Sequence, residues 1–299
     1  MNFDVVTFGS AFVDVYLASP DFKKVGKTLC EVYGGKVGIK KMVITTGGGA
    51  TNTAVGLERL GLQTACVCCV GRDDWGLFIR KELHREGVSQ LYIQQVAEPT
   101  SYSTILVTED GGRTALVFRG ASNHLSWSKV EWAKLDPAWF YVSSLGGDFN
   151  MLTKIVRQAE KTGAKIALNP GSQEIVAATK LKAFLPKIEV LILNADEAKI
   201  LPGDETKCGA KMVAITAGRK WATLIYGKKR IKLPAIQVKT IEETGAGDAF
   251  GCGLVAGLVK GWDLERALKL GIANGAAVTE HYGPKQGLLF APEAEQWLK

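Results

Sequence analysis

The chain has 299 residues, of which 46% are hydrophobic and 22% are charged, and these proportions exclude a disordered, collagen-like or coiled-coil protein. The formal net charge is +7. The longest apolar run, near residues 249–259, is shorter than the roughly 18 residues needed to span a bilayer. The first residues lack the basic and apolar regions of a signal peptide, so we expect a cytoplasmic protein with reduced thiols.

Two segments hold the surplus of positive charge. Residues 21–45 carry six Lys against two acids, and residues 219–232 carry six basic residues and no acid. Such segments are typical of contacts with nucleic acid, an anionic membrane or a phosphorylated ligand. More often such segments are solvated surface without a partner, so charge alone assigns no function.

The N-terminal half of the sequence predicts strands interspersed with two helices. The strands are apolar runs, and a glycine closes each helix. The predicted strands are 3–8 and 64–70, and the predicted helices are 51–60 and 75–86.

Two further segments, 29–45 and 91–119, are rich in β-forming residues, and residues 109–112 form a hairpin-turn sequence within the second. We expect them to build a small, partly exposed sheet beside the core.

From about residue 139 onward, short apolar strands alternate with helical stretches. Alternation of this kind predicts βαβ crossovers and a mostly parallel sheet, hence a single α/β domain over residues 1–299. The predicted strands are 140–143, 165–168, 190–193 and 212–216, and the predicted helices are 151–161, 173–184, 247–260 and 264–280.

Cys66, Cys68 and Cys69 invite comparison with a metal site. They lie in the apolar run 64–70, where neighbouring side chains of a strand point to opposite faces, and no second Cys or His cluster completes a tetrahedral set. We expect these thiols to pack in the core.

The most informative motif is Gly245-Ala246-Gly247-Asp248, at the start of a long apolar helix. Glycines there allow a ligand to approach the free N–H groups, which favour an anion. An Asp in this place suits a base that takes a proton from a hydroxyl while the amides stabilise a transferring phosphoryl group. The alternative is that Asp248 is an ordinary first-turn acid that favours the helix dipole.

Two other motifs have both a binding and a structural interpretation. Gly48 and Gly49 allow close approach of a ligand, and Asn52 can bond a polyol, although a plain strand-to-helix turn has the same pattern. Asn194 and Glu197 are three apart at a predicted helix start, which suits hydrated Mg²⁺ or a capping box.

In combination, these motifs resemble both signatures of the ribokinase-like (PfkB) carbohydrate kinases. The resemblance runs over nearly the whole chain, from Gly9 to Asn274, and includes Gly61, the segment 71–76 and Thr244. It implies a three-layer α/β/α domain with a mostly parallel sheet and a small β-sheet lid from segments of about 14–45 and 91–119. It also implies phosphoryl transfer from ATP to a hydroxyl, with Mg²⁺ as cofactor.

The resemblance also implies roles for individual residues. Asp248 is implied as general base, with the amides of Gly245, Ala246 and Gly247 as its anion hole, and Glu197 as the Mg²⁺ contact through water. The substrate contacts implied are Asp14, Gly48, Gly49 and Asn52, and the nucleotide and phosphate contacts are Asn194, Glu197, Thr216, Gly218 and Asn274.

The chain departs from the family pattern at four places. Glu242 replaces an Asp that helps relatives bind a monovalent cation, which leaves activation by K⁺ open, and Trp221 replaces a glycine of the nucleotide loop. The connection 201–211 is short enough that a helix usual in relatives is shortened or lost. The Arg-x-Lys element of phosphosugar-specific relatives is not visible near residues 99–103, which disfavours fructose phosphate as the substrate.

The acceptor is therefore expected to be a small sugar, a sugar acid or, alternatively, a nucleoside, and no nucleic acid or membrane partner is expected. An aromatic lid would favour a nucleobase, and Tyr33, Tyr102 and Phe118 leave this open. Arg119 either meets a sugar-acid carboxylate or lies on the surface. We also expect a homodimer through the lid, because pairing would cover its exposed edges.

Overall fold

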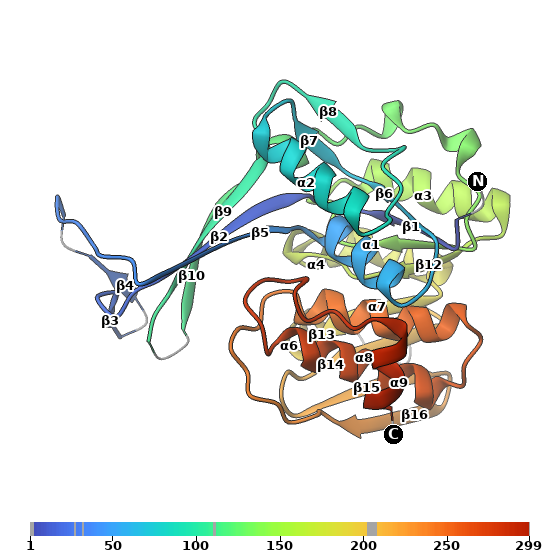
Figure 1. The fold of residues 1–299 in the computed structure, drawn as a ribbon. Helices are drawn as coiled ribbons and strands as arrows, with labels where there is room; N and C mark the ends of the chain where they lie inside the picture. Colours follow the sequence, from blue (N-terminus) through green and yellow to red (C-terminus); the bar gives the residue numbers. More distant parts are fainter. Residues whose placement is uncertain (1–2, 27, 32, 110–111, 202–207, 299) are drawn as a thin grey trace.

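The computed structural model describes residues 3–26, 28–31, 33–109, 112–201 and 208–298, and a sheet projects from its main body (Figure 1). The body is built on eight strands in the order β16-β15-β14-β13-β12-β11-β1-β6. The strands from β14 to β6 run parallel, whereas β15 and β16 are antiparallel at one edge. Their bounds are β1 Val5–Phe8, β6 Thr64–Val67, β11 Trp139–Val142, β12 Lys165–Leu168, β13 Val190–Asn194, β14 Met212–Thr216, β15 Trp221–Tyr226 and β16 Lys229–Pro234.

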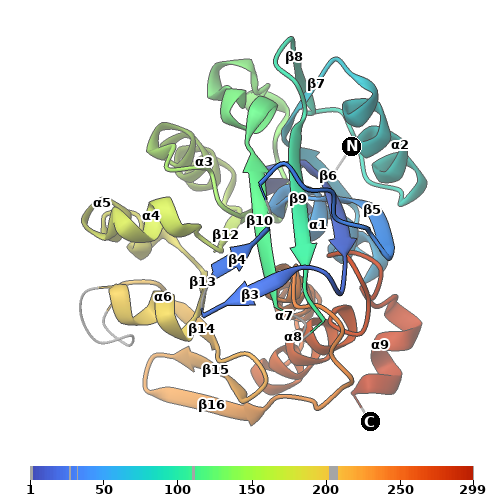
Figure 2. The same cartoon turned by 90° about the vertical axis from the view of Figure 1, so that its left-hand side faces the viewer.

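Helices cover both faces of this sheet (Figure 2). Neighbouring residues of β1 face opposite ways: Val6 packs in the cluster that contains Leu152, and Val5 packs in the one that contains Leu254. The predicted three-layer α/β/α fold is therefore confirmed. The helices of the first face are α3 Phe149–Thr162, α4 Ser172–Val176, α5 Ala178–Lys182 and α6 Ala195–Ile200; those of the second are α1 Gly49–Arg59, α7 Ala246–Val259, α8 Leu264–Val278 and α9 Ala291–Trp297.

The projecting sheet has the strand order β10-β9-β2-β5 and forms the lid. Asp14 pairs with Ser103 and with Thr45, so these three side chains share the face that we call the inner face. The opposite, outer face is partly covered by α2 (Asp74–Arg85), which contacts β2 and β5. The lid strands are β2 Phe12–Ala18, β5 Lys41–Gly47, β9 Ser101–Val107 and β10 Arg113–Phe118.

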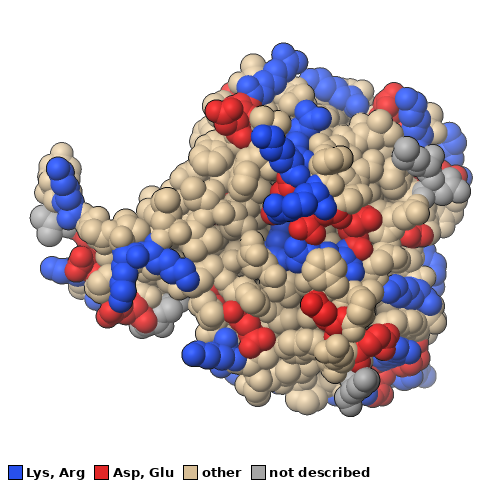
Figure 3. All heavy atoms as spheres, viewed as in Figure 1, with Lys and Arg blue, Asp and Glu red and all other residues tan. Residues whose placement is uncertain are grey.

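A two-stranded arm, β3 (Lys23–Val25) and β4 (Thr28–Cys30), extends beyond the lid. It carries part of the first basic segment, whose basic residues are all Lys, and blue side chains are visible on it in Figure 3. The second basic segment forms β15 and β16. Tyr226 pairs with Lys229 at the turn of this hairpin, whereas Trp221 pairs with Pro234 at its other end, so the basic residues of one sequence run are spread along the hairpin.

Several predicted elements need correction. The strand predicted at 64–70 is divided at Cys68, because the chain leaves the central sheet there and β7 (Cys69–Gly71) pairs with β8 (Gln94–Val96) instead. The helix predicted at 173–184 is divided at Ala177 into α4 and α5. Residues 110–111 of the predicted hairpin turn and 202–207 of the short connection lie outside the described residues.

The three clustered cysteines are fully buried, which confirms the prediction that they pack in the core. Among the described residues there is no group of three or more His, Cys, Asp or Glu side chains able to hold a metal. No helix in the described part of the chain has the length and apolar character needed to span a membrane.

Candidate active site

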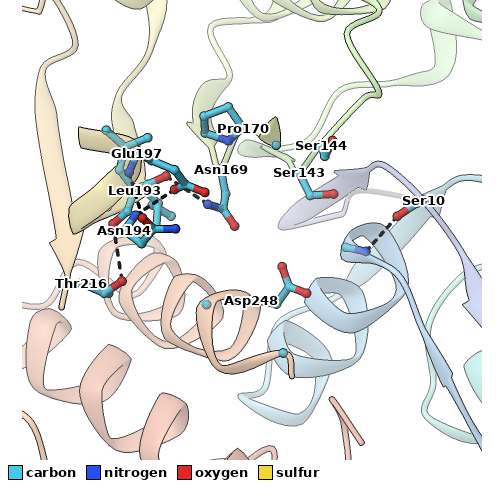
Figure 4. Close-up of a pocket in the computed structure, with 15 residues that line it drawn as sticks. Ser10, Ser143, Ser144, Asn169, Pro170, Leu193, Asn194, Glu197, Thr216 and Asp248 are labelled. Atoms are coloured by element: carbon cyan, nitrogen blue, oxygen red, sulfur yellow. Dashed lines mark hydrogen bonds between the residues drawn. The ribbon is translucent and has the colours of Figure 1, made fainter. Parts of the chain in front are cut away.

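A pocket of about 330 Å³ lies where the parallel strands end (Figure 4). In open α/β sheets this edge is the usual place for a ligand. Polar side chains at or just after five strand ends line one wall, and α7 forms the floor. The strand-end residues are Ser10, Ser143, Asn169, Asn194 and Thr216.

Asp248 points into this pocket from the first turn of α7 (Figure 4). The helix starts after Gly245, whose φ of 82° is a left-handed conformation that favours glycine, and a Cβ at this position would lie 2.4 Å from Pro284. The carboxylate of Asp248 accepts a hydrogen bond of 2.8 Å from the Asn52 side chain on α1. Two motifs 196 residues apart are thereby brought together.

Burial raises the pKa of Asp248 from its ordinary value of 3.8 to about 6, while the bond from Asn52 and the nearby ammonium of Lys285 lower it. At neutral pH the carboxylate is therefore charged but more basic than a solvated Asp. A general base needs a pKa close to the working pH, so this environment suits proton abstraction.

The amides expected to form an anion hole are not equivalent. The N–H of Ala246 donates to the carbonyl of Glu243 at 3.2 Å, within the turn that begins α7. The N–H groups of Gly245 and Gly247 have no hydrogen-bond acceptor among the described residues. Both glycines line the pocket, so two free donors at the positive end of the α7 dipole remain for an anion.

The glycine cluster before α1 allows very close packing. Gly48 has a φ of 96°, and a Cβ there would lie 2.5 Å from the carbonyl oxygen of Ser10. A Cβ on Gly49 would lie 2.4 Å from Ser143 Oγ. Of the two, only Gly49 lines the pocket, while Gly48 shapes the turn that presents α1.

Asn52 has a hydrogen-bond acceptor that the described residues leave unused. Its side-chain nitrogen is bonded to Asp248, but its Oδ1 is buried and has no hydrogen-bond partner among the described residues. A buried acceptor without a donor costs free energy, on the order of 1–3 kcal/mol. A hydroxyl bound beside Asp248 would satisfy it.

Asp14 is buried on the inner face of the lid. Its carboxylate lies against Gly47, where a Cβ would approach to 1.9 Å. Burial raises the pKa of Asp14 to about 6, and a hydrogen bond with Ser103 and the ammonium of Lys285 lower it. Asp14 therefore lies at the joint between lid and body, and it is not among the residues that line the pocket of Asp248.

Asn194 and Glu197 form a reciprocal capping box at the start of α6. The Asn194 side chain accepts from the N–H groups of Asp196 and Glu197, each at 2.9 Å, and Glu197 Oε2 accepts from the Asn194 N–H at 2.8 Å. The motif therefore forms the capping box that was one of its two expected interpretations. Both side chains nevertheless line the pocket, where Glu197 Oε1 has no described partner, and burial raises the pKa of Glu197.

A second cavity of about 370 Å³ adjoins the first and shares Asn194, Thr216 and Gly247 with it. Its walls are mostly apolar, as an adenine site requires. Trp221 lies here, with the Lys232 ammonium 4.4 Å from its ring centroid. Further residues that line this cavity are Arg113, Gly218, Arg219, Val238, Ala246, Phe250 and Ile272.

Asn274 does not reach this cavity. It is fully buried between helices, where its side chain donates to the carbonyl of Ala249 at 2.7 Å and accepts from the N–H of Leu289 at 3.0 Å. Both ends of the amide are used to hold α8 against neighbouring segments, so its implied position beside an adenine is not what the structure shows.

The second basic segment lies only partly at this cavity. Arg219 and Trp221 line the cavity, whereas the basic turn between β15 and β16 lies at the far end of the hairpin.

Two charged residues near the site were not identified from the sequence. Lys285 is 1% exposed and bonds Glu82 at 2.9 Å and Thr46. Arg113 forms an ion pair with the buried carboxylate of Glu242, which also accepts from the Thr244 N–H at 2.8 Å.

The strand-end residues Ser10, Ser143 and Asn169 were also not identified. Ser10 and Asn169 follow runs that were correctly predicted as strands, and Ser143 was predicted as the last residue of a strand that in fact ends at Val142. The rule that polar residues at the carboxyl ends of parallel strands gather at one edge would have found them.

Comparison with known proteins agrees with this geometry. The family model described as pfkB family carbohydrate kinase matches residues 2–289. The chain is 26% identical to the ATP-dependent 6-phosphofructokinase of Thermoanaerobacterium thermosaccharolyticum, over 94% of this chain and 89% of that protein. It is 27% identical to the ribokinase of Haemophilus influenzae, over 100% and 99%.

The fold has solved counterparts. The nucleoside kinase of Burkholderia thailandensis, solved in complex with inosine, superimposes with a TM-score of 0.84 at 20% identity and covers 98% of this chain and 97% of that one. The mostly parallel sheet, the β-sheet lid and a family match over nearly the full length agree with one another. The chain belongs to the pfkB family of carbohydrate kinases, which are phosphotransferases with an alcohol group as acceptor.

Proposed function

We propose that this protein transfers the γ-phosphoryl group of ATP to a hydroxyl of a small sugar or sugar acid, with Asp248 as the general base. The observation that carries the proposal is the Asn52–Asp248 pair. It places a basic carboxylate of pKa about 6 beside an unsatisfied buried amide oxygen. One acceptor hydroxyl gives its proton to Asp248, and a neighbouring hydroxyl donates to Asn52.

The donor fits the second cavity. Apolar side chains such as Val238 and Ile272 would enclose the adenine, and the cavity leads past Thr216 and Gly247 to the pocket of Asp248. The triphosphate would then lie along the free amides of Gly245 and Gly247. ATP appears in the name of one relative, which supports this choice of donor.

Glu197 is suited to a magnesium ion held mainly by water and phosphate. Mg²⁺ typically binds one or two carboxylates and keeps several waters, and Glu197 presents one unbonded oxygen to the pocket. When bound, the ion neutralises phosphate charge. Asn194 keeps Glu197 in place through the capping box.

In the reaction, the acceptor oxygen loses its proton to Asp248 and forms a bond to the γ-phosphorus, and the bond to the β-phosphate oxygen breaks to release ADP. The amides of Gly245 and Gly247 stabilise the charge on the transferring group. Asp14 and Asn52 hold the acceptor so that one hydroxyl faces Asp248.

The proposal is tested by ATP consumption with a panel of pentoses, hexoses, sugar acids and nucleosides. We expect ADP release with a sugar or a sugar acid. A nucleoside kinase is the alternative, and the three aromatics considered from the sequence do not favour it: Tyr33 is fully exposed, and Tyr102 and Phe118 lie on the outer face. If nucleosides alone are phosphorylated, the substrate assignment is wrong.

The pH dependence follows from Asp248. The charged carboxylate is the active form, so we expect the turnover number to fall as the pH drops through about 6, where this group becomes protonated. A pH–rate profile between pH 5 and 8 measures this. A turnover number that stays constant down to about pH 4.5 would mean that no group with this raised pKa limits the reaction.

We expect catalysis without an added monovalent cation. Arg113 on the lid pairs with the buried Glu242 just before the Gly245 turn, so a guanidinium already neutralises this carboxylate. Initial rates in K⁺, Na⁺ and tetramethylammonium buffers should be equal. Arg113→Met leaves Glu242 without a cation, and we expect this variant to gain stimulation by K⁺; equal stimulation of the unmodified protein would contradict the expectation.

The outer face of the lid supports a homodimer. Ile44, Leu116 and Phe118 are 41%, 57% and 47% exposed, and the register places them on this face. A second copy would bury them and cover the edge strands β5 and β10. Leu116→Asp should turn a dimer into a monomer in light scattering, whereas Val176→Asp on α4 should not. A monomeric mass for the unmodified protein at high concentration contradicts the prediction.

A further inference from the structure

A third hollow, of about 480 Å³, lies beside the pocket of Asp248 and shares Ser10 and Ser144 with it. It is bounded by the base of the lid on one side and by the start of α3 on the other. An acceptor with one hydroxyl at Asp248 would therefore extend its far end into this hollow. The residues that give the hollow its chemistry are Arg119, Asn123, Leu145, Asp148 and Gln173.

The acids around the hollow are already in use. Asp148 accepts from the N–H groups of Asn150 and Met151 at 2.9 and 3.0 Å, and it caps the positive end of α3. Behind the wall, the buried Glu174 accepts from the N–H groups of Leu145 and Gly147 at 2.9 and 2.7 Å. These bonds fix the loop between β11 and α3.

Three side chains with hydrogen-bond donors that line the hollow are free. The side chains of Arg119, Asn123 and Gln173 make no hydrogen bond or ion pair with any residue that the structure describes. Arg119 is the one cation among the described residues that line the hollow. The hollow therefore combines a guanidinium with two carboxamides that have no internal acceptor.

The backbone fixes the position of Arg119. Its carbonyl accepts from the Ser122 N–H at 3.1 Å and from the Ser101 hydroxyl, and the Ser122 hydroxyl donates to the carbonyl of Ala11 at 3.1 Å. The turn is thereby attached to the first residue of β9 and to Ala11, which precedes β2, and Arg119 is presented at the lid base.

We propose that this hollow binds the carboxylate of an acid acceptor, so that the substrate is a polyhydroxy acid held by Arg119 at one end and by Asp248 at the other. The inference rests on the proposed function and narrows its substrate class. A guanidinium matches a carboxylate with two parallel hydrogen bonds, and such charge-assisted bonds are roughly twice as strong as neutral ones. None of the described residues lining the hollow is aromatic, so it offers no ring on which a nucleobase could stack.

Binding measurements test the assignment. By titration calorimetry we expect aldonic acids of five and six carbons to bind the unmodified protein more tightly than their parent aldoses. Arg119→Gln should weaken acid binding by about tenfold to a hundredfold, the usual effect of losing a hydrogen bond to a charged group, and leave aldose binding unchanged. Arg119→Lys should restore part of the loss, and Arg157→Gln, an exposed Arg on α3, should have no effect.

The inference is overturned if aldoses bind as tightly as the acids, if Arg119→Gln weakens both equally, or if a nucleoside or sugar phosphate binds more tightly than every acid. This readout is separate from turnover. If acids bind through Arg119 and neither they nor any sugar of the panel is phosphorylated, the proposed function alone is contradicted, whereas phosphorylation confined to neutral sugars overturns the present inference alone.

Discussion

Replacing Asp248 with Asn is expected to reduce the turnover number by about a thousandfold, within the range for loss of a general base. Asn keeps the shape of the side chain and can still contact Asn52, but it cannot accept a proton. The affinity for the acceptor should change little, since the other contacts stay in place. Turnover is measured by ADP release and affinity by titration calorimetry.

The same variant should be more stable than the unmodified protein. A pKa raised in the folded state from 3.8 to about 6 costs at most about 3 kcal/mol of the free energy of unfolding once the pH is above 6, because the unfolded chain ionises more easily. Asp248→Asn removes this cost at pH 7.5, and its advantage should vanish below about pH 4. Denaturant unfolding measures the difference.

Asp136→Asn serves as the matched control, because Asp136 is exposed. It should change neither activity nor stability. If Asp248→Asn lost activity together with stability, the loss would reflect damage to the fold, and the general-base role would be left without support. Near-normal ADP release from Asp248→Asn with the correct acceptor would refute that role directly.

The sequence predicted the elements whose ends carry unambiguous signals. α1 and α2 end within two residues of the predicted positions because glycines follow them, and α8 starts at the predicted residue 264, where Asp263 caps it. It did not predict β15 and β16, since a hairpin with four basic residues in its turn and second strand resembles solvated surface. Their strand character depends on pairing with β14, a contact that no local pattern encodes.

The site was predicted where one local motif is sufficient for the chemistry. The glycine turn that places Asp248 at a helix start is readable from adjacent residues, and so is the pair Asn194–Glu197. The side chains that meet Asp248 in three dimensions could not be read in this way, because the contact between Asn52 and Asp248 joins segments that are far apart in the sequence. Asn274 is the reverse case. The family motif implied a contact with the nucleotide, whereas in the structure the side chain bonds the backbone of Ala249 and Leu289.

Lys285 is the residue that sequence reasoning had least chance of finding. It lies in the polar segment Gly283-Pro284-Lys285, and Lys is almost never buried unless it is paired. In the structure it is 1% exposed, and its pair with Glu82 joins the C-terminal segment to α2. Its neighbour Pro284 packs against Gly245, so this ion pair supports the turn that presents Asp248.

Replacing Lys285 with Met should therefore lower the free energy of unfolding by about 3–5 kcal/mol, because it leaves the Glu82 carboxylate buried without a counter-charge. It should also move the acid limb of the pH–rate profile to higher pH, since the ammonium lowers the pKa of both Asp14 and Asp248. Urea unfolding and the pH dependence of turnover measure the two effects.

The double variant Glu82→Gln and Lys285→Met separates charge from packing. If the unpaired carboxylate causes the loss, the double variant should recover most of the stability. Lys187→Met breaks an exposed pair with Glu160 and should cost less than about 1 kcal/mol. A double variant as unstable as Lys285→Met would show that the lysine acts through its packing, and an unmoved acid limb would show that its charge does not reach Asp248.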